Sequence, residues 1–313
     1  MKLEELNYPH PVEPVDAKSF DIEKWRRETP MDYFKAAYIL NQANHPIVMA
    51  EVFKAIYQVT RYYIPSTLYK YVSLSTNAQS NEKRFRALDE SKIFLSAASA
   101  LNDPYDCKAC YYNPEELQKY DRLVSCNGRL IDDFSAFLRV VSLTANGETS
   151  MPMWAHYANN HAGYCIAYDM KENALLASCT FPVQYSEQRL DITSLMDSIA
   201  RSVTGALETQ TSDGNNEILI DELSVAYLIS LLCNIKQSAW AYENEYRCSM
   251  GATTAGMPYV DAKAKAVYIG MNCAPDHVKR LREIGAKLKI PVFYMVEDEL
   301  SSNYKLIAKA FDE

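Results

Sequence analysis

The sequence predicts an α/β (α+β) protein in which short strands form a mixed central sheet and helical segments are inserted between them. Short apolar and aromatic runs bounded by turn-forming residues recur from residue 66 onward, as is typical of short strands. Near the end of the chain, strand-like residues 266–270 and 291–296 flank a segment that Pro275 opens as a helix, which indicates a β-α-β unit. With 313 residues, 48% of them hydrophobic, the chain can bury a large core.

The charge and composition of the chain argue against membrane insertion and a broad nucleic-acid footprint. The net charge of −8 gives no overall basic field that would attract nucleic acid or anionic lipid. The first residues, MKLEELNYPHPVEP, lack the basic and apolar stretches of a signal peptide, and no apolar run approaches the length of a membrane span. The 8 cysteines are scattered, which favours reduced thiols and a cytoplasmic location.

The spacing of cysteine and histidine does not predict a metal site. Cys107 and Cys110 form a C-x-x-C pair, but no second such pair and no histidine pair completes a zinc site. His156 and His161 are separated by a spacing that does not stack two ligands on one face of a helix. We therefore expect no bound metal.

The chain is expected to divide near residue 65. Residues 1–65 begin with an acidic, proline-containing arm, after which apolar residues recur at helical spacing. The Asn44-His45-Pro46 break divides this stretch into a helical hairpin. Residues 66–313 are expected to form the α/β domain, with a helical insertion at about 186–238.

Within residues 66–313 the pattern of apolar residues predicts the order of the elements. Strands are expected at 68–72, 92–96, 164–169, 183–185, 242–250, 266–270 and 291–296. Helices are expected at 81–90, 114–145, 153–161 and 275–288. Gly163 follows the third of these helices and would end it in a left-handed cap.

A first cluster of candidate site residues is Tyr69-Lys70-Tyr71, on a predicted strand. Because side chains alternate along a strand, the two tyrosines share one face and Lys70 points to the other. A lysine among apolar residues is costly to bury, so Lys70 should reach a rim, a carboxylate or a phosphate. An ordinary lysine on an edge strand is the alternative.

A second cluster follows the next predicted strand and contains small polar side chains. Its members are Ser96, Ser99, Asn102, Asp103 and Asp106. Hydroxyl, amide and carboxylate groups at the end of a strand suit the oxygens of a ligand. The alternative is a loop in which these side chains cap their own backbone.

A third cluster consists of Trp154, Tyr157 and His161. Their spacing of i, i+3 and i+7 places them on one face of a helix, where two amphipathic aromatic rings and an imidazole could form a stacking wall for a planar ligand. A stripe of aromatic residues at this spacing is also what a helix packed on a core would show.

The fourth cluster, Glu243, Glu245 and Arg247, is the most informative. On a strand these three residues would project from the same face. Two carboxylates so close on a half-buried face cost stability and raise the pKa of one of them unless a function or a cation maintains them. A solvated sheet face with Arg247 bridging the two glutamates is the alternative.

Taken in this order, the clusters resemble a widespread bacterial family of uncharacterised proteins. The resemblance covers roughly residues 66 to 300 and leaves the helical N-terminal segment outside. The elements of the family appear here as LYKY (68–71), FLSAASALNDPYD (94–106), MWAHYANNHAGYCIAYD (153–169), VQY (183–185) and WAYENEYR (240–247).

More distantly, the arrangement is similar to the core of ADP-ribosyltransferases, which carry three motifs on successive strands. These motifs are a His, Arg or Tyr, then a strand containing Ser or Tyr, then a catalytic Glu that is often part of a Glu-x-Glu pair. Residues 69–71, 95–99 and 243–245 would fill them in that order. The sequence departs from the pattern at Lys70, where Arg or His is commoner, and in Ser-Ala-Ala-Ser, which is one residue longer than Ser-Thr-Ser.

This resemblance implies NAD-dependent transfer of ADP-ribose to a macromolecule, either protein or nucleic acid. Glu245 would hold a ribose hydroxyl and stabilise an oxocarbenium-like transition state. Glu243 would orient or deprotonate the acceptor.

NAD would be bound as a substrate by residues from all four clusters. Tyr71 with Tyr157 or Trp154 would stack on nicotinamide, and Lys70 with Arg247 would balance the pyrophosphate. The remaining expected contacts to NAD are Tyr69, Ser96, Ser99, Asn102, Asp103 and His161.

Bacterial enzymes of this type are often toxins, so a toxin or phage-defence role with an antitoxin partner is implied by analogy. Two other functions stay open. One is a magnesium-dependent nuclease in which Asp103 or Asp106, Glu243, Glu245 and a lysine such as Lys236 hold the metal. The other is a non-catalytic binding module that uses the aromatic stripe.

Overall fold

The computed structural model describes residues 64–205, apart from positions 132, 195, 198 and 202, together with residues 233–251 and 258–311. The predicted arm and helical hairpin lie outside these ranges, apart from residues 64 and 65, and so does most of the predicted helical insertion. No helix within these ranges is long and apolar enough to span a membrane.

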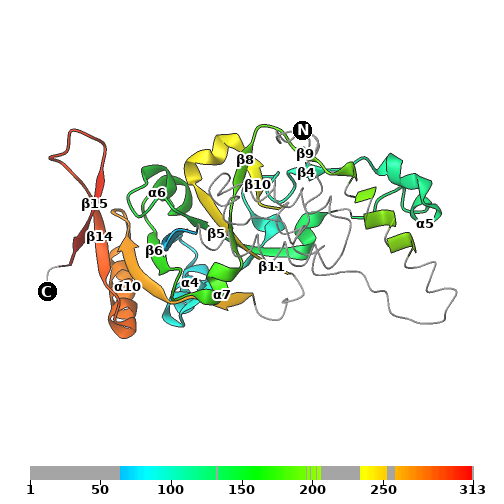
Figure 1. Ribbon diagram of the computed structural model, residues 1–313. Helices are drawn as coiled ribbons and strands as arrows, with labels where there is room; N and C mark the ends of the chain where they lie inside the picture. Colours follow the sequence, from blue (N-terminus) through cyan, green and yellow to red (C-terminus); the bar gives the residue numbers. More distant parts are fainter. Residues whose placement is uncertain are drawn as a thin grey trace, which may run out of the picture.

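A mixed sheet of nine strands forms the centre of the described part of the protein. Figure 1 labels its strands β5, β6, β11, β14 and β15. Eight strands follow the order β15-β14-β13-β6-β1-β5-β11-β7, and β3 pairs with β5 beside this path. The strands are β1 (Thr67–Val72), β3 (Ser96–Ala97), β5 (Leu138–Thr144), β6 (Tyr164–Asp169), β7 (Thr180–Pro182), β11 (Glu245–Gly251), β13 (Ala264–Ile269), β14 (Val292–Glu297) and β15 (Leu306–Ala310).

Three two-stranded sheets and several helices complete the described part of the chain. The small sheets pair β2 (Lys92–Phe94) with β12 (Tyr259–Asp261), β4 (Cys110–Tyr111) with β9 (Leu190–Asp191), and β8 (Gln184–Ser186) with β10 (Ile235–Gln237). The α-helices are α4 (Ala78–Asp89), α5 (Asp121–Val124), α6 (Met151–Tyr157), α7 (Ala174–Ser178) and α10 (Pro275–Leu288). Short 3₁₀ helices are η2 (Ala98–Ala100), η3 (Pro114–Lys119), η4 (Phe134–Phe137) and η5 (Ser238–Glu243).

The main hydrophobic core lies on one face of the large sheet. Leu68 of β1, Leu143 of β5 and Tyr246 of β11 belong to it, together with Phe85 of α4 and Leu281 of α10. Because side chains alternate along each strand, the residues next to these ones point to the opposite face. That opposite face therefore receives Ser142 and Thr144 of β5 and Glu245 and Arg247 of β11.

The pairing of β1 with β5 is confined to a single pair of residues. On its other side β1 pairs with β6 along its whole length, from Thr67 opposite Asp169 to Val72 opposite Tyr164. Its pairing with β5 is limited to Tyr69 opposite Thr144. Farther along, β5 pairs with the short strand β3 instead, with Ser96 opposite Val140. A gap therefore opens in the middle of the sheet, between β1 and β5.

The structure confirms much of the predicted fold and most of its strands. The mixed central sheet is present, β6 and α10 have the predicted bounds, and β13, α10 and β14 form the predicted unit with parallel strands. The prediction of a helix over 114–145 is wrong, because this stretch ends in the central strand β5. Alternating and β-branched residues at 138–144 are typical of a strand, and this signal was outweighed by the apolar spacing before it.

Two other predicted boundaries are corrected. The region 186–238 is not entirely helical, since β9 and β10 lie near its two ends, although the described positions between 193 and 205 are helical. Gly163 does not form a left-handed cap; Asn159, Asn160 and His161 take positive φ values of 49°, 52° and 67° instead.

Substituting Gly163 tests the close approach of β1 to the start of β6. A Cβ atom at Gly163 would lie 2.0 Å from the carbonyl oxygen of Val72, so Gly163→Ala should lower the free energy of unfolding by about 1–3 kcal/mol. Gly205→Ala is the matched control, because a Cβ there meets no atom within 4 Å. Urea denaturation of both variants measures the difference, and equal stabilities would contradict the described contact.

Candidate active site

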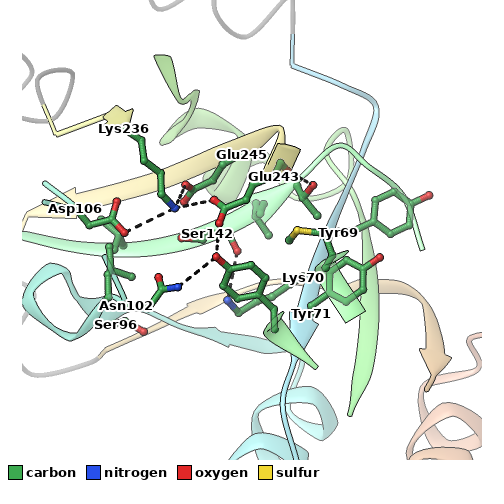
Figure 2. A pocket seen from close by; sticks show the side chains of 16 residues that line it. Tyr69, Lys70, Tyr71, Ser96, Asn102, Asp106, Ser142, Lys236, Glu243 and Glu245 are labelled. Carbon is green, nitrogen blue, oxygen red and sulfur yellow. Dashed lines mark hydrogen bonds and ion pairs between the residues drawn. The ribbon is translucent and has the colours of Figure 1, made fainter. Parts of the chain in front are cut away.

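A cavity of about 160 Å³ opens at the gap between β1 and β5 and collects residues from all four sequence clusters. Figure 2 shows its acidic side chains opposite the tyrosines of β1. Its lining consists of Tyr69, Lys70, Tyr71, Ser96, Leu101, Asn102, Asp106, Val140, Ser142, Leu143, Thr144, Met153, Tyr157, Lys236, Glu243 and Glu245.

Glu245 is the fixed anion of this site. It is the first residue of β11 and lies opposite Thr144, which in turn lies opposite Tyr69. Arg247 binds its carboxylate with two hydrogen bonds, from Nε to Oε1 at 3.0 Å and from Nη2 to Oε2 at 2.9 Å. Burial alone would raise the pKa of Glu245, but Arg247 and Lys236 outweigh it and lower this pKa to about 2. Glu245 is therefore negatively charged at neutral pH.

Glu243 reaches the same site from a different element. It ends the 3₁₀ helix η5, and Asn244 then reverses the backbone with φ 45° before β11 begins. The Tyr157 hydroxyl donates to its Oε1, and Lys236 Nζ donates to its Oε2 at 2.7 Å. Burial, reinforced by the charge of Glu245, raises the pKa of Glu243 despite these partners. The prediction that Glu243 shares a strand with Glu245 is wrong, although both side chains do face one cavity.

Lys236, on β10, lies in the middle of the carboxylates. Its Nζ is 2.7 Å from Glu243 Oε2, 3.3 Å from Glu245 Oε2 and 3.8 Å from Asp106 Oδ2. Burial lowers the pKa of Lys236, but Glu245 and Asp106 outweigh that effect and raise it. The ammonium group is therefore charged and holds the acidic side chains together.

Arg247 supports the site from within the protein. Its side chain is fully buried, and besides Glu245 it donates to Asp106 Oδ1 at 2.8 Å and to the Cys233 carbonyl at 3.0 Å. Arg247 and Lys236 thus face three carboxylates, those of Asp106, Glu243 and Glu245. Burial is the main reason that protons bind Glu243 more readily than an exposed glutamate, and the charge of Glu245 adds to it.

Lys70 extends into the gap between the strands. Its Nζ donates to the Ser142 carbonyl at 3.4 Å, and burial lowers its pKa to about 8, although Glu245 opposes this shift. Lys70 also lines a second cavity of about 400 Å³, which shares Tyr71, Ser96 and Tyr157 with the first. The two cavities therefore meet at the gap.

The second cavity is basic and aromatic. Lys83 and Arg84 of α4 and Lys92 of β2 contribute cations to its wall, while Tyr164 and Tyr168 are among its aromatic residues. Among the described residues, none that lines it is a carboxylate. An acidic cavity and a basic cavity therefore lie next to each other.

Eight of the thirteen residues predicted for the site line the first cavity. They are Tyr69, Lys70, Tyr71, Ser96, Asn102, Tyr157, Glu243 and Glu245. Asn102 donates to the Tyr157 hydroxyl at 3.4 Å, which joins the second and third clusters.

The other five predicted residues do not line the cavity. Ser99 is exposed on η2, and Asp103 accepts a hydrogen bond from its own turn, at Tyr105 N, as the alternative for that cluster foresaw. Arg247 lies behind Glu245, fully buried, where it cannot meet a pyrophosphate without leaving its carboxylates. These positions correct the corresponding sequence predictions.

Trp154 belongs to the core next to the site, and the half-buried His161 stacks against it. Helix α6 ends at Tyr157, so the predicted helical stripe does not continue to His161. Trp154 is fully buried, with its ring 5.1 Å from that of Tyr71 and 5.9 Å from that of His161. Trp154 therefore positions Tyr71 and is not available for stacking on a ligand.

Sequence reasoning missed several residues of the site. Ser142 and Thr144 were missed because β5 was predicted as helix, and Lys236 entered only the nuclease alternative. Asp106 belonged to the second cluster and to the nuclease alternative but not to the expected contacts with NAD. Tyr185, on β8, accepts a hydrogen bond from the backbone N–H of Glu245 at 2.8 Å. The motif VQY contained this tyrosine, but nothing local indicates its partner. Across the described ranges, no group of three or more His, Cys, Asp or Glu side chains is arranged to hold a metal ion.

Comparison with known proteins gives one match. The model of a family described as a protein of unknown function (DUF2971) matches residues 153–248, from α6 to β11. No curated protein and no solved structure matches the chain. The match includes Tyr157, Lys236, Glu243 and Glu245, and it supports the expected resemblance to an uncharacterised family.

Proposed function

We propose that this protein is an NAD-dependent ADP-ribosyltransferase that modifies a macromolecule. The observation that carries the proposal is the convergence of Glu243 and Glu245, from two different elements, on one tyrosine-lined cavity at a gap in the sheet. The two carboxylates differ in acidity, because the pKa of Glu245 is lowered and that of Glu243 is raised. Such a pair supports a division of roles between a permanent anion and a proton acceptor.

Glu245 is suited to bond cleavage. Breaking the bond between nicotinamide and ribose develops positive charge on the ribose, and a preorganised anion stabilises that charge most in a water-poor site. Arg247 and Lys236 fix the carboxylate of Glu245 before substrate arrives, so little reorganisation is needed. In this role Glu245 contacts the ribose and its hydroxyl groups.

Glu243 is suited to the acceptor. Its carboxylate is hydrogen bonded to Tyr157 and Lys236, and its raised pKa brings it closer to the range where it takes up a proton. In this role Glu243 removes the proton from the attacking group of the acceptor as the new bond to ribose forms.

The two neighbouring cavities match the charge distribution of NAD. The nicotinamide ring is cationic and fits the acidic cavity, between Tyr71 and Tyr157. The pyrophosphate is anionic and fits the basic cavity, where Lys70, Lys83 and Arg84 are available. At about 160 Å³ the acidic cavity is small for a dinucleotide, so the adenosine end would extend into the larger one.

The nuclease alternative has less support from the geometry. The ammonium group of Lys236 already occupies the centre of the three carboxylates, where a divalent cation would have to bind. A toxin or phage-defence role, with an antitoxin partner, follows only by analogy with other bacterial enzymes of the proposed class.

Substitution of the two glutamates separates their roles. Glu245→Gln should lower NAD turnover by about 10²–10³-fold, because the charge that faces the ribose is removed. Glu243→Gln should impair labelling of the acceptor more than hydrolysis of NAD, since water can replace the acceptor. Glu283→Gln, on the exposed face of α10, is the control and should be neutral.

The measurements are nicotinamide release and incorporation of labelled NAD into lysate protein, RNA and DNA, with circular dichroism as a check on folding. Equal turnover by the wild type and a folded Glu245→Gln variant would refute the proposal. Nucleic-acid cleavage that needs Mg²⁺ but not NAD would favour the nuclease instead.

The pKa of Lys70 predicts how NAD binding depends on pH. Below its pKa of about 8 the side chain is a cation that attracts the pyrophosphate, and above this pH the charge is lost. The KM for NAD should therefore rise as the pH increases through about 8. Lys70→Arg keeps its charge and should remove the rise, whereas Lys70→Met should give a high KM at every pH. A wild-type KM that stays constant well above this pH would exclude Lys70 from the binding site.

A further inference from the structure

Two buried thiols lie next to the charged network of the site. The Cys233 Sγ atom is 3.8 Å from the carbonyl oxygen of Cys107, and the two side chains belong to one small cluster beneath η2 and β5. Arg247 contacts both residues, with Nη1 at 3.6 Å from Cys107 Sγ and at 3.0 Å from the Cys233 carbonyl oxygen. Each thiol is also the largest influence on the pKa of the other.

The two thiols are chemically unequal. The hydrogen bond from Cys233, followed by the charge of Arg247, lowers the pKa of Cys107 in spite of its burial. The same hydrogen bond, together with burial, raises the pKa of Cys233. Cys107 is thus the side chain with thiolate character, and Cys233 is a protonated thiol held beside it.

Cys107 is also connected to the surface. It lines a cavity of about 440 Å³ that includes Lys108, Tyr111 and Arg129, all of which are exposed. A molecule as small as a peroxide could approach Cys107 from this side without passing through the acidic cavity. The backbone of Cys107 adopts φ 57°, an uncommon conformation for a residue other than glycine, and such conformations concentrate at functional positions.

We propose that Cys107 and Cys233 form a peroxide-responsive pair that closes to a disulfide and disturbs the neighbouring carboxylate network. The Cys107 thiolate attacks one oxygen of the peroxide, the O–O bond breaks, and Cys107 becomes a sulfenic acid while the second oxygen leaves as water after protonation. The Cys233 sulfur then attacks the Cys107 sulfur, the S–OH bond breaks, and a second water leaves. The peroxide is the oxidant, and the two thiols together lose two electrons.

The disulfide would act on the site through its two flanking segments. Asp106 precedes Cys107 and holds Arg247, while Cys233 lies two residues before β10, the strand that carries Lys236. An S–S bond of about 2.0 Å is much shorter than a hydrogen-bonded contact between thiols, so both segments must move when it forms. This part of the inference rests on the proposed function, because it expects a change in NAD turnover.

Peptide mapping of the wild-type protein tests the modification itself. After treatment with hydrogen peroxide and blocking of free thiols, digestion without reductant should yield a peptide that links Cys107 to Cys233. Dithiothreitol should remove it. Cys126 is exposed and serves as the internal control for general oxidation. A linked Cys107–Cys110 peptide, or a Cys107 that remains fully alkylatable after Cys126 is oxidised, would overturn the inference.

Two variants define the order of the steps. In Cys233→Ser the sulfenic acid of Cys107 should persist and react with dimedone, whereas in Cys107→Ser the thiol of Cys233 should stay reduced. The reverse pattern would contradict the assigned roles. Because the wild-type measurement needs neither variant, a folding defect in them would leave the inference testable.

Activity gives a separate readout. Oxidation should lower NAD turnover of the wild type by roughly tenfold to a hundredfold, reversibly, because displacements of about 1 Å in a preorganised site have effects of that size. If no form of the protein consumes NAD, the proposed function fails. The linked peptide still shows whether the disulfide between Cys107 and Cys233 forms. A fully cross-linked protein with unchanged turnover would show that the disulfide does not reach the site.

Discussion

The bidentate contact between Arg247 and Glu245 is the interaction on which the site depends. Both side chains are buried, and the guanidinium group also binds Asp106 and the Cys233 carbonyl, so it joins β11 to two segments that are distant in the sequence. Removing one partner of a buried ion pair typically costs about 3–5 kcal/mol, because the other charge is left uncompensated. The pair therefore stabilises the local fold as long as Glu245 is ionised, and its lowered pKa keeps it ionised at neutral pH.

The cavity exists because the sheet is interrupted. A continuous pairing of β1 with β5 would fill the space in which Lys70, Ser142 and Tyr71 now line the cavity. The strands keep a polar link there through the Lys70 ammonium group, which donates to the Ser142 carbonyl. Beyond the gap β3 pairs with β5, so the edge of β5 is left unpaired only within the gap. The central sheet thus supplies both a rigid frame and an opening.

The sequence predicted those residues of the site that would be energetically costly to bury without a partner. Two neighbouring glutamates and a lysine within a strand indicate function because each is expensive without a partner, and Glu243, Glu245 and Lys70 do meet in the cavity. Trp154 was misassigned because an aromatic residue at helical spacing suits a core as well as a ligand wall. The contacts of Lys236 with its carboxylates could not be predicted from the sequence. Its contact with Asp106 is long-range and depends on the position that β10 takes beside β8.

The two glutamates are held in place by different elements. Glu245 is part of a strand that is paired on both sides, whereas Glu243 ends a 3₁₀ helix and is separated from the strand by the left-handed residue Asn244. Glu243 is held by its contacts with Thr144, Tyr157 and Lys236 and not by the pairing of a strand. Under the proposed function, substitutions in residues 238–243 would therefore change the choice of acceptor while β11 keeps Glu245 in place.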